Sequence, residues 1–223
     1  MSHHHPDADM ILAHAAGTLR GGVALVVATH VEGCAHCRRH VSEFEALGGA
    51  AIESIEPDTL RPDALARTLA RIDAAPRRAS APSAAAAPPH ARVLAQLPGA
   101  TPWPLSLQGC AITRWRWIGP GMRWSRVTLP HDASANVFLL RIAAGKCLPP
   151  HTHSELELTQ VLYGSFHDGR ALFGPGDFDA ADGSIHHQPV VQAGGECVCL
   201  ASVTGKVMFD GAIARMLGSL VGM

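Results

Sequence analysis

The sequence has no long hydrophobic run, no run of basic residues and little net charge. Its apolar stretch near the start reaches only from Val23 to Ala28, far short of the roughly 20 residues that a membrane-spanning helix needs. No basic segment followed by an apolar one opens the chain, so no secretion signal is visible, and we expect a cytoplasmic protein with no membrane span. The 18 basic and 19 acidic side chains leave a net charge of −1. This balance gives no overall reason to bind a polyanion, and the missing Lys/Arg run argues against direct DNA contact.

What the chain does contain is a globular composition with many possible metal ligands. Of its 223 residues, 47% are hydrophobic and 17% are charged, which excludes wholesale disorder. This length suits one large or two small domains. There are 14 histidines, most of them near Cys or Glu, and six cysteines. In a chain without an export signal, such cysteines favour thiols and metal ligands over disulfides.

An Ala- and Pro-rich stretch divides the chain. Residues 76–90 read PRRASAPSAAAAPPH, which holds too few apolar residues to build a core and is typical of a linker. Such a linker cannot hold two domains rigidly together, so we expect each domain to fold around a core of its own. The predicted division is a helical domain, a linker, a β domain and a C-terminal tail, over residues 1–75, 76–101, 102–213 and 214–223.

The segment before the linker has helical patterns. We expect helices over residues 10–16, 22–30, 38–47 and 62–74. Asp9 is the expected N-cap of the first helix, and Gly17 is expected to end it. The pair Gly48-Gly49 is expected to end the third.

The fourth predicted helix is amphipathic. Pro62 is expected in its first turn. Leu65, Leu69 and Ile72 are spaced to form one apolar stripe. That stripe either packs within the domain or forms a face for a partner protein.

The segment after the linker has the pattern of a β structure. Alternating or β-rich runs follow one another between Gly, Pro and Asp turns, namely AITRWRWI, MRWSRVTL, NVFLLRIAAG, ELTQVLYGSF and ECVCLASV. Many short strands at close spacing predict a barrel or a sandwich. The predicted fold class is therefore α+β in two domains, a helical bundle followed by an antiparallel β domain.

The first candidate metal site is the H-x3-C-x2-C motif of His30, Cys34 and Cys37. On one continuous helix, offsets of four and seven residues place these side chains within a narrow arc. Alternatively, one helix ends at His30 and the next opens with the two cysteines. Either geometry directs one nitrogen and two sulfurs at a common centre, and a closed structural Zn²⁺ site needs one more ligand. The candidates for it are His5, His14, His36 and His40.

His5 is the preferred fourth ligand, because it lies just before the first helix, whose packing can bring it to the second. The run of histidines at residues 3–5 has a second interpretation, a disordered tail or the remnant of a tag. A segment of about 75 residues with a thin core needs an added constraint, so we interpret this zinc as structural rather than catalytic.

The second candidate site is the G-x5-H-x-H-x3-E-x6-G pattern with His151, His153 and Glu157. Residues two apart in a strand share a face, so the two histidines project together. Glu157 is expected on the same strand face or after a bulge. Two imidazoles and a carboxylate suit Zn, Fe, Mn or Ni. This spacing resembles the first motif of the cupin family, and the resemblance implies a small β-barrel with one more His ligand from a second motif.

The second motif departs from the usual cupin pattern. After the Gly174-Pro175-Gly176-Asp177 turn, the text ADGSIHHQPV has two adjacent histidines. Adjacent residues of a strand face opposite sides, so only one of His186 and His187 is expected inside the barrel. Our prediction is His187, which stands in an H-x-P pattern.

Two further cysteines share a strand face in the text ECVCL. Cys197 and Cys199 are either packed thiols in a barrel wall or an oxidisable pair. The motifs assign no role to Cys110 or Cys147.

Two metal motifs joined by an Ala/Pro linker resemble the ChrR-type anti-sigma factors. The matching text covers nearly the whole chain except the linker and the tail, namely AAGTL at 15–19, LVVATHVEGCAHC at 25–37, LPPHTHSELELTQVLYGSF at 148–166, FGPGDFDAAD at 173–182 and ECVCLAS at 196–202. The resemblance implies a zinc-bound helical anti-sigma domain and a cupin-like sensor barrel.

The resemblance also implies ligands, a partner and a signal. It places Zn²⁺ on His5, His30, Cys34 and Cys37. It places Zn²⁺ or another divalent transition metal on His151, His153, Glu157 and His187. The implied function is to sequester a sigma factor of the extracytoplasmic-function (ECF) group and to release it when the barrel senses singlet oxygen or organic peroxide, and so to regulate transcription without catalysis.

The chief alternative is an enzyme, a metal-dependent cupin dioxygenase or isomerase with the N-terminal zinc segment as an assembly module. Three imidazoles and one carboxylate can activate O₂ when they hold Fe(II). No additional acid/base set in the sequence suggests a substrate, so the regulatory function is the preferred prediction.

Overall fold

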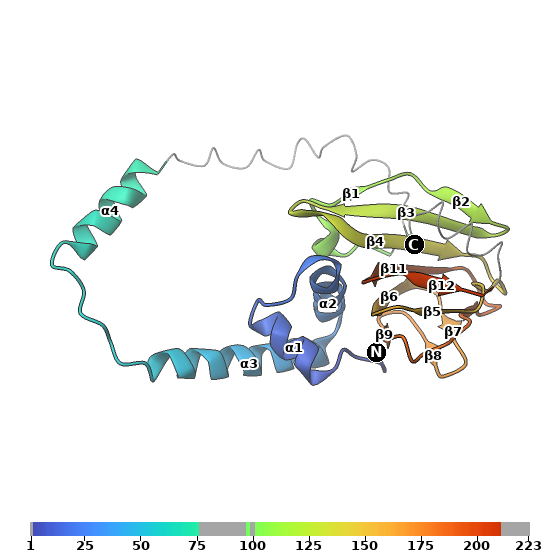
Figure 1. Cartoon of the computed structure of the whole chain (residues 1–223), viewed down its shortest axis with the longest axis horizontal. Coiled ribbons are helices and arrows are strands. Elements are labelled where there is room, and N and C mark those ends of the chain that lie inside the picture. The colour runs from blue at the N-terminus through green and yellow to red at the C-terminus, as the bar shows by residue number, and fades with distance from the viewer. Residues whose placement is uncertain (1, 76–96, 99–100, 211–223) are drawn as a thin grey trace.

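The structure is a computed structural model that describes residues 2–75, 97–98 and 101–210. Four helices come first in the chain and an antiparallel β domain follows, as Figure 1 shows. This order and composition confirm the predicted fold class. Most of the predicted linker and the whole predicted tail lie outside the described residues, so the domain boundaries stay predictions.

All four predicted helices are present, as α1 (Ala8–Ala15), α2 (Gly21–Gly33), α3 (Ala35–Glu53) and α4 (Ala64–Ala74). The expected cap of α1 is wrong by two residues. Asp7 is the N-cap, and its carboxylate accepts a hydrogen bond of 2.7 Å from the backbone N–H of Met10. A capping side chain accepts a hydrogen bond from the N–H two or three residues ahead. Asp7 does so and has the extended backbone of an N-cap, whereas Asp9 lies in the first turn of the helix.

The predicted end of α3 is also wrong, because the helix runs through Gly48 and Gly49 to Glu53. A glycine ends a helix by taking a positive φ, and neither of these glycines does so. Gly17, by contrast, has φ +66° just after α1. Pro62 lies before α4 rather than in its first turn, since that helix begins at Ala64.

The β domain is built from twelve described strands. Six of them form the main path of a seven-stranded antiparallel sheet, in the order β1-β3-β4-β11-β6-β9, with β2 paired to β3. Two smaller sheets, β10-β7-β8 and β12-β5, complete the domain. The strands are β1 (Ala111–Ile112), β2 (Arg116–Gly119), β3 (Met122–Leu129), β4 (Asp132–Ile142), β5 (His151–His153), β6 (Glu157–Tyr163), β7 (Phe166–His167), β8 (Leu172–Phe173), β9 (Phe178–Ala181), β10 (Val190–Val191), β11 (Cys197–Val203) and β12 (Val207–Phe209).

Pairing among the described strands does not close this domain into a complete ring. β1 and β9 lie at the two ends of the main sheet, and the smaller sheets pair separately. The interior is therefore enclosed by packing between sheets, and we use "barrel" for this partly open arrangement. The predicted run AITRWRWI divides into β1 and β2, both of which pair with β3.

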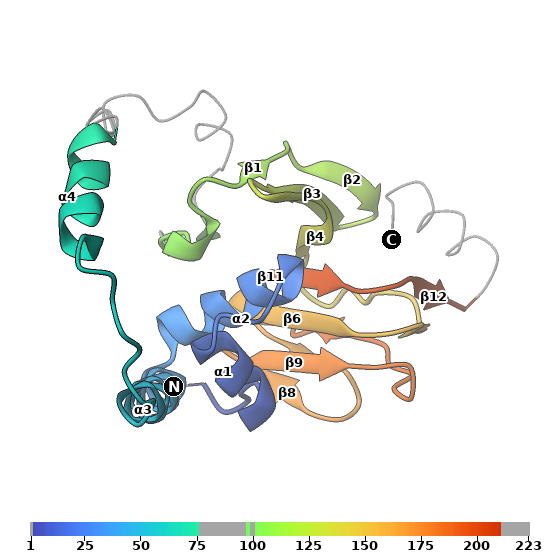
Figure 2. The ribbon, with the colours of Figure 1, turned by 60° about the vertical axis from the view of Figure 1, so that its left-hand side comes forward.

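Helices α1, α2 and α3 share one hydrophobic cluster with the barrel, so the expectation of two separate cores is wrong. Val26 and Val27 of α2 are fully buried in the same cluster as Leu139 of β4, Leu158 of β6 and Leu200 of β11. Figure 2 shows α2 lying against the strands β6 and β11. Burial of each such side chain contributes roughly 1.5–3 kcal/mol of stability. This favours a fixed contact between the helices and the barrel over the independent movement that the linker composition suggests.

A glycine permits this close approach of helix and sheet. A Cβ atom added at Gly22 would lie 2.5 Å from Cγ2 of Val137 and 2.2 Å from Oγ of Ser202. Any larger residue at the start of α2 would force the helix away from the barrel.

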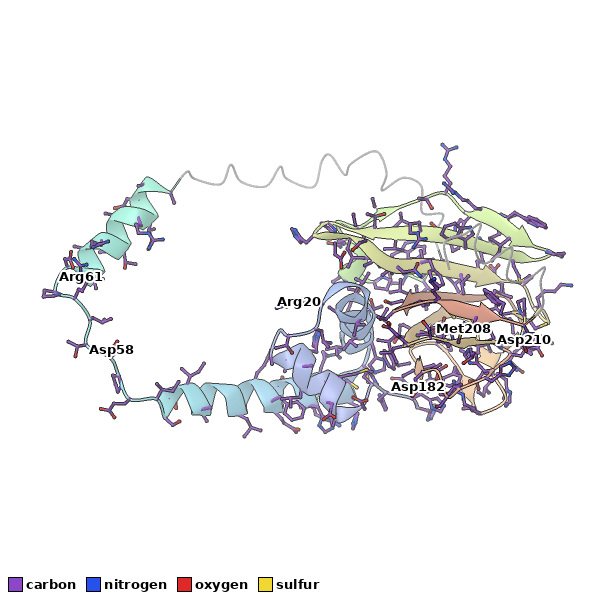
Figure 3. All side chains as sticks on the ribbon, in the orientation of Figure 1. Arg20, Asp58, Arg61, Asp182, Met208 and Asp210 are labelled. Carbon is purple, nitrogen blue, oxygen red and sulfur yellow. The ribbon has the colours of Figure 1, made fainter. Side chains whose placement is uncertain are left out.

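The helix α4 stands apart from the rest of the molecule in Figures 1 and 2. It has no buried residue. Figure 3 shows the side chains of the stretch before it, around Asp58 and Arg61, pointing into open space. Within the part of the chain that the structure describes, no helix is both long enough and apolar enough to cross a membrane.

Candidate metal centres

Three groups of possible metal ligands lie among the described residues, one among the helices and two in the barrel. The smaller barrel group, Asp168, Asp179 and His187, shares His187 with the four-residue group beside it. The helical cluster consists of His5, His30, Cys34 and Cys37, and the ligand atoms of these residues all lie within 4.8 Å of one another. The barrel cluster consists of His151, His153, Glu157 and His187, within the same limit.

The helical cluster is assembled at the junction of α2 and α3. His30 is in the last turn of α2, and Cys34 adopts an extended conformation, with φ −106° and ψ 108°, between the two helices. Cys37 is in the first turn of α3. The structure thus has a helix break within the motif, as in the second of the two predicted geometries, but it falls after Gly33 rather than at His30. His5 comes from the extended segment before α1.

The other candidate histidines lie outside this cluster. His36 and His40 stand in a row beside His5, with ring centroids 4.8 Å apart for His5 and His36 and 4.6 Å apart for His36 and His40. His40 also pairs with Glu43 on the next turn of α3. His14 lies on α1. The geometry therefore favours His5 over these three as the fourth ligand.

The distances within the helical cluster fit a tetrahedral Zn²⁺ ion. Nδ1 of His5 lies 3.3 Å from Nε2 of His30 and 3.5 Å from each of the two Sγ atoms. Sγ of Cys37 lies 3.3 Å from Nε2 of His30. Ligands at zinc-bond lengths of about 2.1 and 2.3 Å from a tetrahedral centre are separated by roughly 3.3–3.8 Å.

The two thiols differ in acidity for physical reasons. Burial acts to raise the pKa of Cys34, but hydrogen bonds from the Ser2 hydroxyl and from backbone N–H groups outweigh it, so that its pKa is lowered. Burial and the adjacent Cys34 raise the pKa of Cys37 to about 12. Two thiols this close cannot both ionise without a cation between them, and a divalent ion supplies the missing charge.

The barrel cluster directs three imidazole nitrogens and one carboxylate at a single point. Nε2 of His187 lies 3.1 Å from Nε2 of His151 and 3.3 Å from Nε2 of His153. Oε2 of Glu157 lies 2.9 Å from Nε2 of His153 and 3.8 Å from each of the other two. Three converging Nε2 atoms in a buried site need a cation or shared protons, which fits a divalent transition metal.

Strand geometry explains how these ligands meet. His151 and His153 lie on the same face of β5, as the spacing predicts. Glu157, expected on the same strand face or after a bulge, begins the next strand, β6, after a turn. His187 is hydrogen-bonded to His151 through both backbone groups, at 3.0 Å each. The neighbouring His186 points outward and pairs with Asp210 at 2.8 Å, so His187 is the one of the two that faces inward.

The electrostatics of the barrel cluster follow from burial and close pairing. Burial acts to raise the pKa of Glu157, but hydrogen bonds from His151 and His153 outweigh it and hold that pKa well below its usual range. Burial and the neighbouring His151 lower the pKa of His187. A neutral imidazole and an ionised carboxylate are the forms that bind a metal.

Groups outside the cluster orient its ligands. The Nδ1 atom of His151 lies 2.8 Å from the carbonyl oxygen of Pro149, which directs Nε2 inward. Oδ2 of the buried Asp168 lies 3.5 Å from Nδ1 of His187. Arg170 bridges this carboxylate to Asp179, with which it makes bonds of 2.8 and 2.9 Å. Carboxylate partners of this kind fix the ring orientation of a metal-binding histidine, although Nδ1 of His187 makes no hydrogen bond at this separation.

A small cavity of about 40 Å³ adjoins the barrel cluster. Its polar lining is supplied by His151, Glu157, Thr159, Asp179 and His187. Cys197 and Cys199 line it too, with their sulfurs 3.6 Å apart. Cys197 and burial raise the pKa of Cys199, which suits packed thiols in the barrel wall.

Sequence reasoning missed four buried polar residues at or beside the two clusters: Gln160, Asp168, Asp177 and Asp179. Asp168 and Asp177 lie in Gly-containing turns, and a turn explains an Asp without any metal. Only Gln160 could have been noticed in the sequence. It is a polar residue on the otherwise apolar face of its strand, the face opposite to Glu157.

Comparisons with known proteins agree with this architecture. A family model described as the ChrR cupin-like domain matches residues 107–206. The chain is similar to the anti-sigma-E factor ChrR of Cereibacter sphaeroides, with 36% identity over 214 residues, 96% of this chain and 95% of that protein. It is also similar to a chain in the crystal structure of Rhodobacter sphaeroides SigE in complex with the anti-sigma ChrR. That match has a TM-score of 0.69 and 34% identity, and covers 92% of this chain and 100% of that one.

These matches decide between the regulatory and the enzymatic predictions. The relatives are anti-sigma factors, which are regulators, and the similarity extends across both the helices and the barrel. The prediction of a non-enzymatic protein is confirmed, and the dioxygenase or isomerase alternative is not supported. An identity of 36% over 96% of its length shows that this chain belongs to the ChrR-type family of anti-sigma factors.

Proposed function

We propose that this protein binds an ECF-type sigma factor with its helical segment, residues 1–75, and releases it when the barrel senses singlet oxygen or organic peroxide. Release of the sigma factor then activates transcription of its target genes. The observation that carries the binding half of the proposal is the exposed apolar stripe of α4. The family to which the chain belongs supplies the kind of partner.

The stripe consists of Leu65, Leu69 and Ile72, whose exposed fractions are 72%, 51% and 64%. An isolated amphipathic helix of 11 residues is marginally stable in water, since helices gain most of their stability from packing. Exposed apolar residues continue along the end of α3 and the stretch before α4, at Leu47, Ile52, Ile55 and Leu60. Exposed apolar side chains in such number are typical of a segment that binds another protein.

The charge of the helical segment suits a basic partner. Residues 1–75 carry six Arg and ten Asp or Glu, a difference of 6 − 10 = −4. Sigma factors bind nucleic acid, so an acidic inhibitor gains long-range attraction to them.

In this proposal the helical cluster serves folding and the barrel cluster serves sensing. Zn²⁺ bound by His5, His30, Cys34 and Cys37 would join the N-terminal segment, α2 and α3 into one unit that presents α4. The barrel ligands His151, His153, Glu157 and His187 would hold Zn²⁺ or another divalent transition metal beside the small cavity. A change there would shift the population from the sigma-bound to the sigma-free state.

Co-expression with the ECF-type sigma factor encoded beside this protein tests the proposal. We expect a stable one-to-one complex on size-exclusion chromatography, and loss of that complex after exposure of the purified pair to singlet oxygen or an organic hydroperoxide. A protein that forms no complex with that sigma factor would contradict the binding half. A complex that withstands both oxidants would contradict the sensing half alone.

A further inference from the structure

The barrel contacts a ligand of the helical cluster directly. Oε1 of Gln160, on β6, lies 3.0 Å from Nδ1 of His30. The amide nitrogen of Gln160 is used elsewhere, since it donates to the carbonyl oxygen of Val161 at 3.2 Å. Gln160 therefore offers His30 an acceptor, so Nδ1 of His30 carries the proton and Nε2 keeps its lone pair for the cluster.

This contact is fully removed from water. His30 is 1% exposed and Gln160 is 3% exposed. The ring of Phe178, on β9, packs edge-on against His30 with centroids 5.7 Å apart. A buried hydrogen bond with no competing water holds the imidazole in one orientation, which is what a metal ligand needs.

The barrel also holds the segment that carries His5. The carboxylate of Asp177 accepts hydrogen bonds from the backbone N–H groups of His3 and His4. The N–H of Phe178 donates to the carbonyl oxygen of His4 at 3.1 Å. These bonds pair the N-terminal segment with the start of β9, one residue before His5.

The strands that make these contacts also face the barrel cluster. On β6, Glu157 and Thr159 line the inner cavity, while Leu158 and Gln160 face the helices. Glu157 and Gln160 are three residues apart, or roughly 10 Å along a strand. The two clusters are therefore connected through β6. Glu157, a ligand of the barrel cluster, is on one face of this strand, and Gln160, which contacts the helical cluster, is on the other.

We propose that Gln160 is a positioning residue for the zinc site of the helical cluster, supplied by the barrel. It orients His30 through Nδ1, and Asp177 restrains the segment of His5. The helical zinc site is then shared between the two parts of the molecule. This proposal concerns zinc affinity and stands independently of sigma binding.

A matched pair of variants tests it in the full-length protein. Gln160→Met and Gln160→Glu both remove the bond to the Val161 carbonyl, but only the glutamate keeps an acceptor for His30. Loss of an outer-sphere partner costs about 10–100-fold in metal affinity, so we expect that loss for Gln160→Met and near wild-type affinity for Gln160→Glu. Gln192→Met, the same change at an exposed glutamine outside both clusters, is the control and should leave the affinity unchanged.

Competition between Co²⁺ and Zn²⁺ separates the two clusters, because only the helical cluster has thiolate ligands and gives a thiolate-to-cobalt charge-transfer band. Wild-type affinity in Gln160→Met, or equal losses in both variants, would overturn the proposal. Nitrogen-15 NMR of the wild-type protein gives a test that needs no variant to fold. It should find His30 bound to zinc through Nε2, with a slowly exchanging Nδ1 proton, and coordination through Nδ1 would reject the assignment.

Discussion

The helical and barrel clusters differ in what holds their ligands in place before any metal binds. The helical cluster gathers two sulfurs and two nitrogens from three segments, which are the N-terminal stretch, the end of α2 and the start of α3. The barrel cluster gathers three nitrogens and a carboxylate from backbone that is already hydrogen-bonded, in β5, β6 and the residue paired with His151. We therefore expect a metal in the first site to contribute more to the fold around it than a metal in the second site, whose ligands are held by strand pairing.

Softness of the ligands adds to this contrast. Thiolates with imidazoles favour a tightly held structural zinc, and imidazoles with a carboxylate accept several divalent metals. In the proposed function, a firmly bound structural ion suits the segment that would capture the sigma factor. A less selective site beside a cavity suits the part that would sense the signal. The experiments below test this division, from the largest expected effect to the smallest.

The largest effect is expected from Cys37→Ala. It removes a ligand of a closed site, and structural zinc contributes about 10–16 kcal/mol of binding free energy in zinc-finger peptides. We expect the helical segment to lose its zinc and its structure, and sigma capture to fall at least about 100-fold. Zinc stoichiometry and pull-down of the sigma factor measure this. Cys110→Ala, at a half-buried thiol outside both clusters, should capture normally, and capture retained by Cys37→Ala would refute the structural role.

A different outcome is expected from His153→Ala. The barrel should lose its metal, while its β structure, the helical zinc and sigma capture are all retained, because the ligands lie on strands held by their own pairing. The response to oxidant should disappear. Circular dichroism, metal analysis and promoter activity under singlet oxygen follow these three properties. The control is His186→Ala, which alters the outward-facing histidine next to His187. Unfolding of the barrel in His153→Ala would show that the barrel cluster also needs its metal for folding, and would contradict the difference between the two clusters.

The variant Leu69→Glu tests whether the sigma factor binds to the α4 stripe, away from both metal clusters. A charge in the middle of the α4 stripe should weaken sigma binding about 10–100-fold, the range expected for a central interface residue. Stability should change by no more than about 0.5 kcal/mol, because Leu69 is exposed. Ala74→Glu, on the opposite face of α4, carries the same charge change and should bind normally. Equal binding by the two variants would remove the stripe from the interface.

A smaller effect is expected from Asp168→Asn, which weakens the group facing Nδ1 of His187. The separation of 3.5 Å is long for a hydrogen bond, so we expect the low end of the outer-sphere range, about tenfold weaker metal binding in the barrel. Chelator competition measures it. Asp182→Asn changes an exposed carboxylate that caps a turn and should leave the affinity unchanged. No difference between the two variants would show that Asp168 serves packing alone.

Residue spacing by itself could predict only those cluster ligands that are close neighbours in the chain. His5 and His187 were predicted from a position before the first helix, from the H-x-P pattern and from the family resemblance. Offsets of four and seven residues brought Cys34 and Cys37 toward His30, and an offset of two put His151 and His153 on one face. These spacings act through local backbone geometry, which residue pattern predicts well. The predicted helix end at Gly48 and Gly49 was wrong because glycine permits a positive φ but does not require it. Neither glycine adopts the conformation that would end a helix.

The sequence by itself determined the class of the molecule: four helices, then an antiparallel β domain, with a metal motif in each. Only the tertiary structure decided that the two parts share one core, that His187 rather than His186 faces inward, and that Gln160 and Asp177 reach the helical cluster. The physical reason is range. Helix and strand periodicity are set within a few residues, whereas the contact of His30 with Gln160 joins positions 130 residues apart and exists because α2 buries its apolar face on β6.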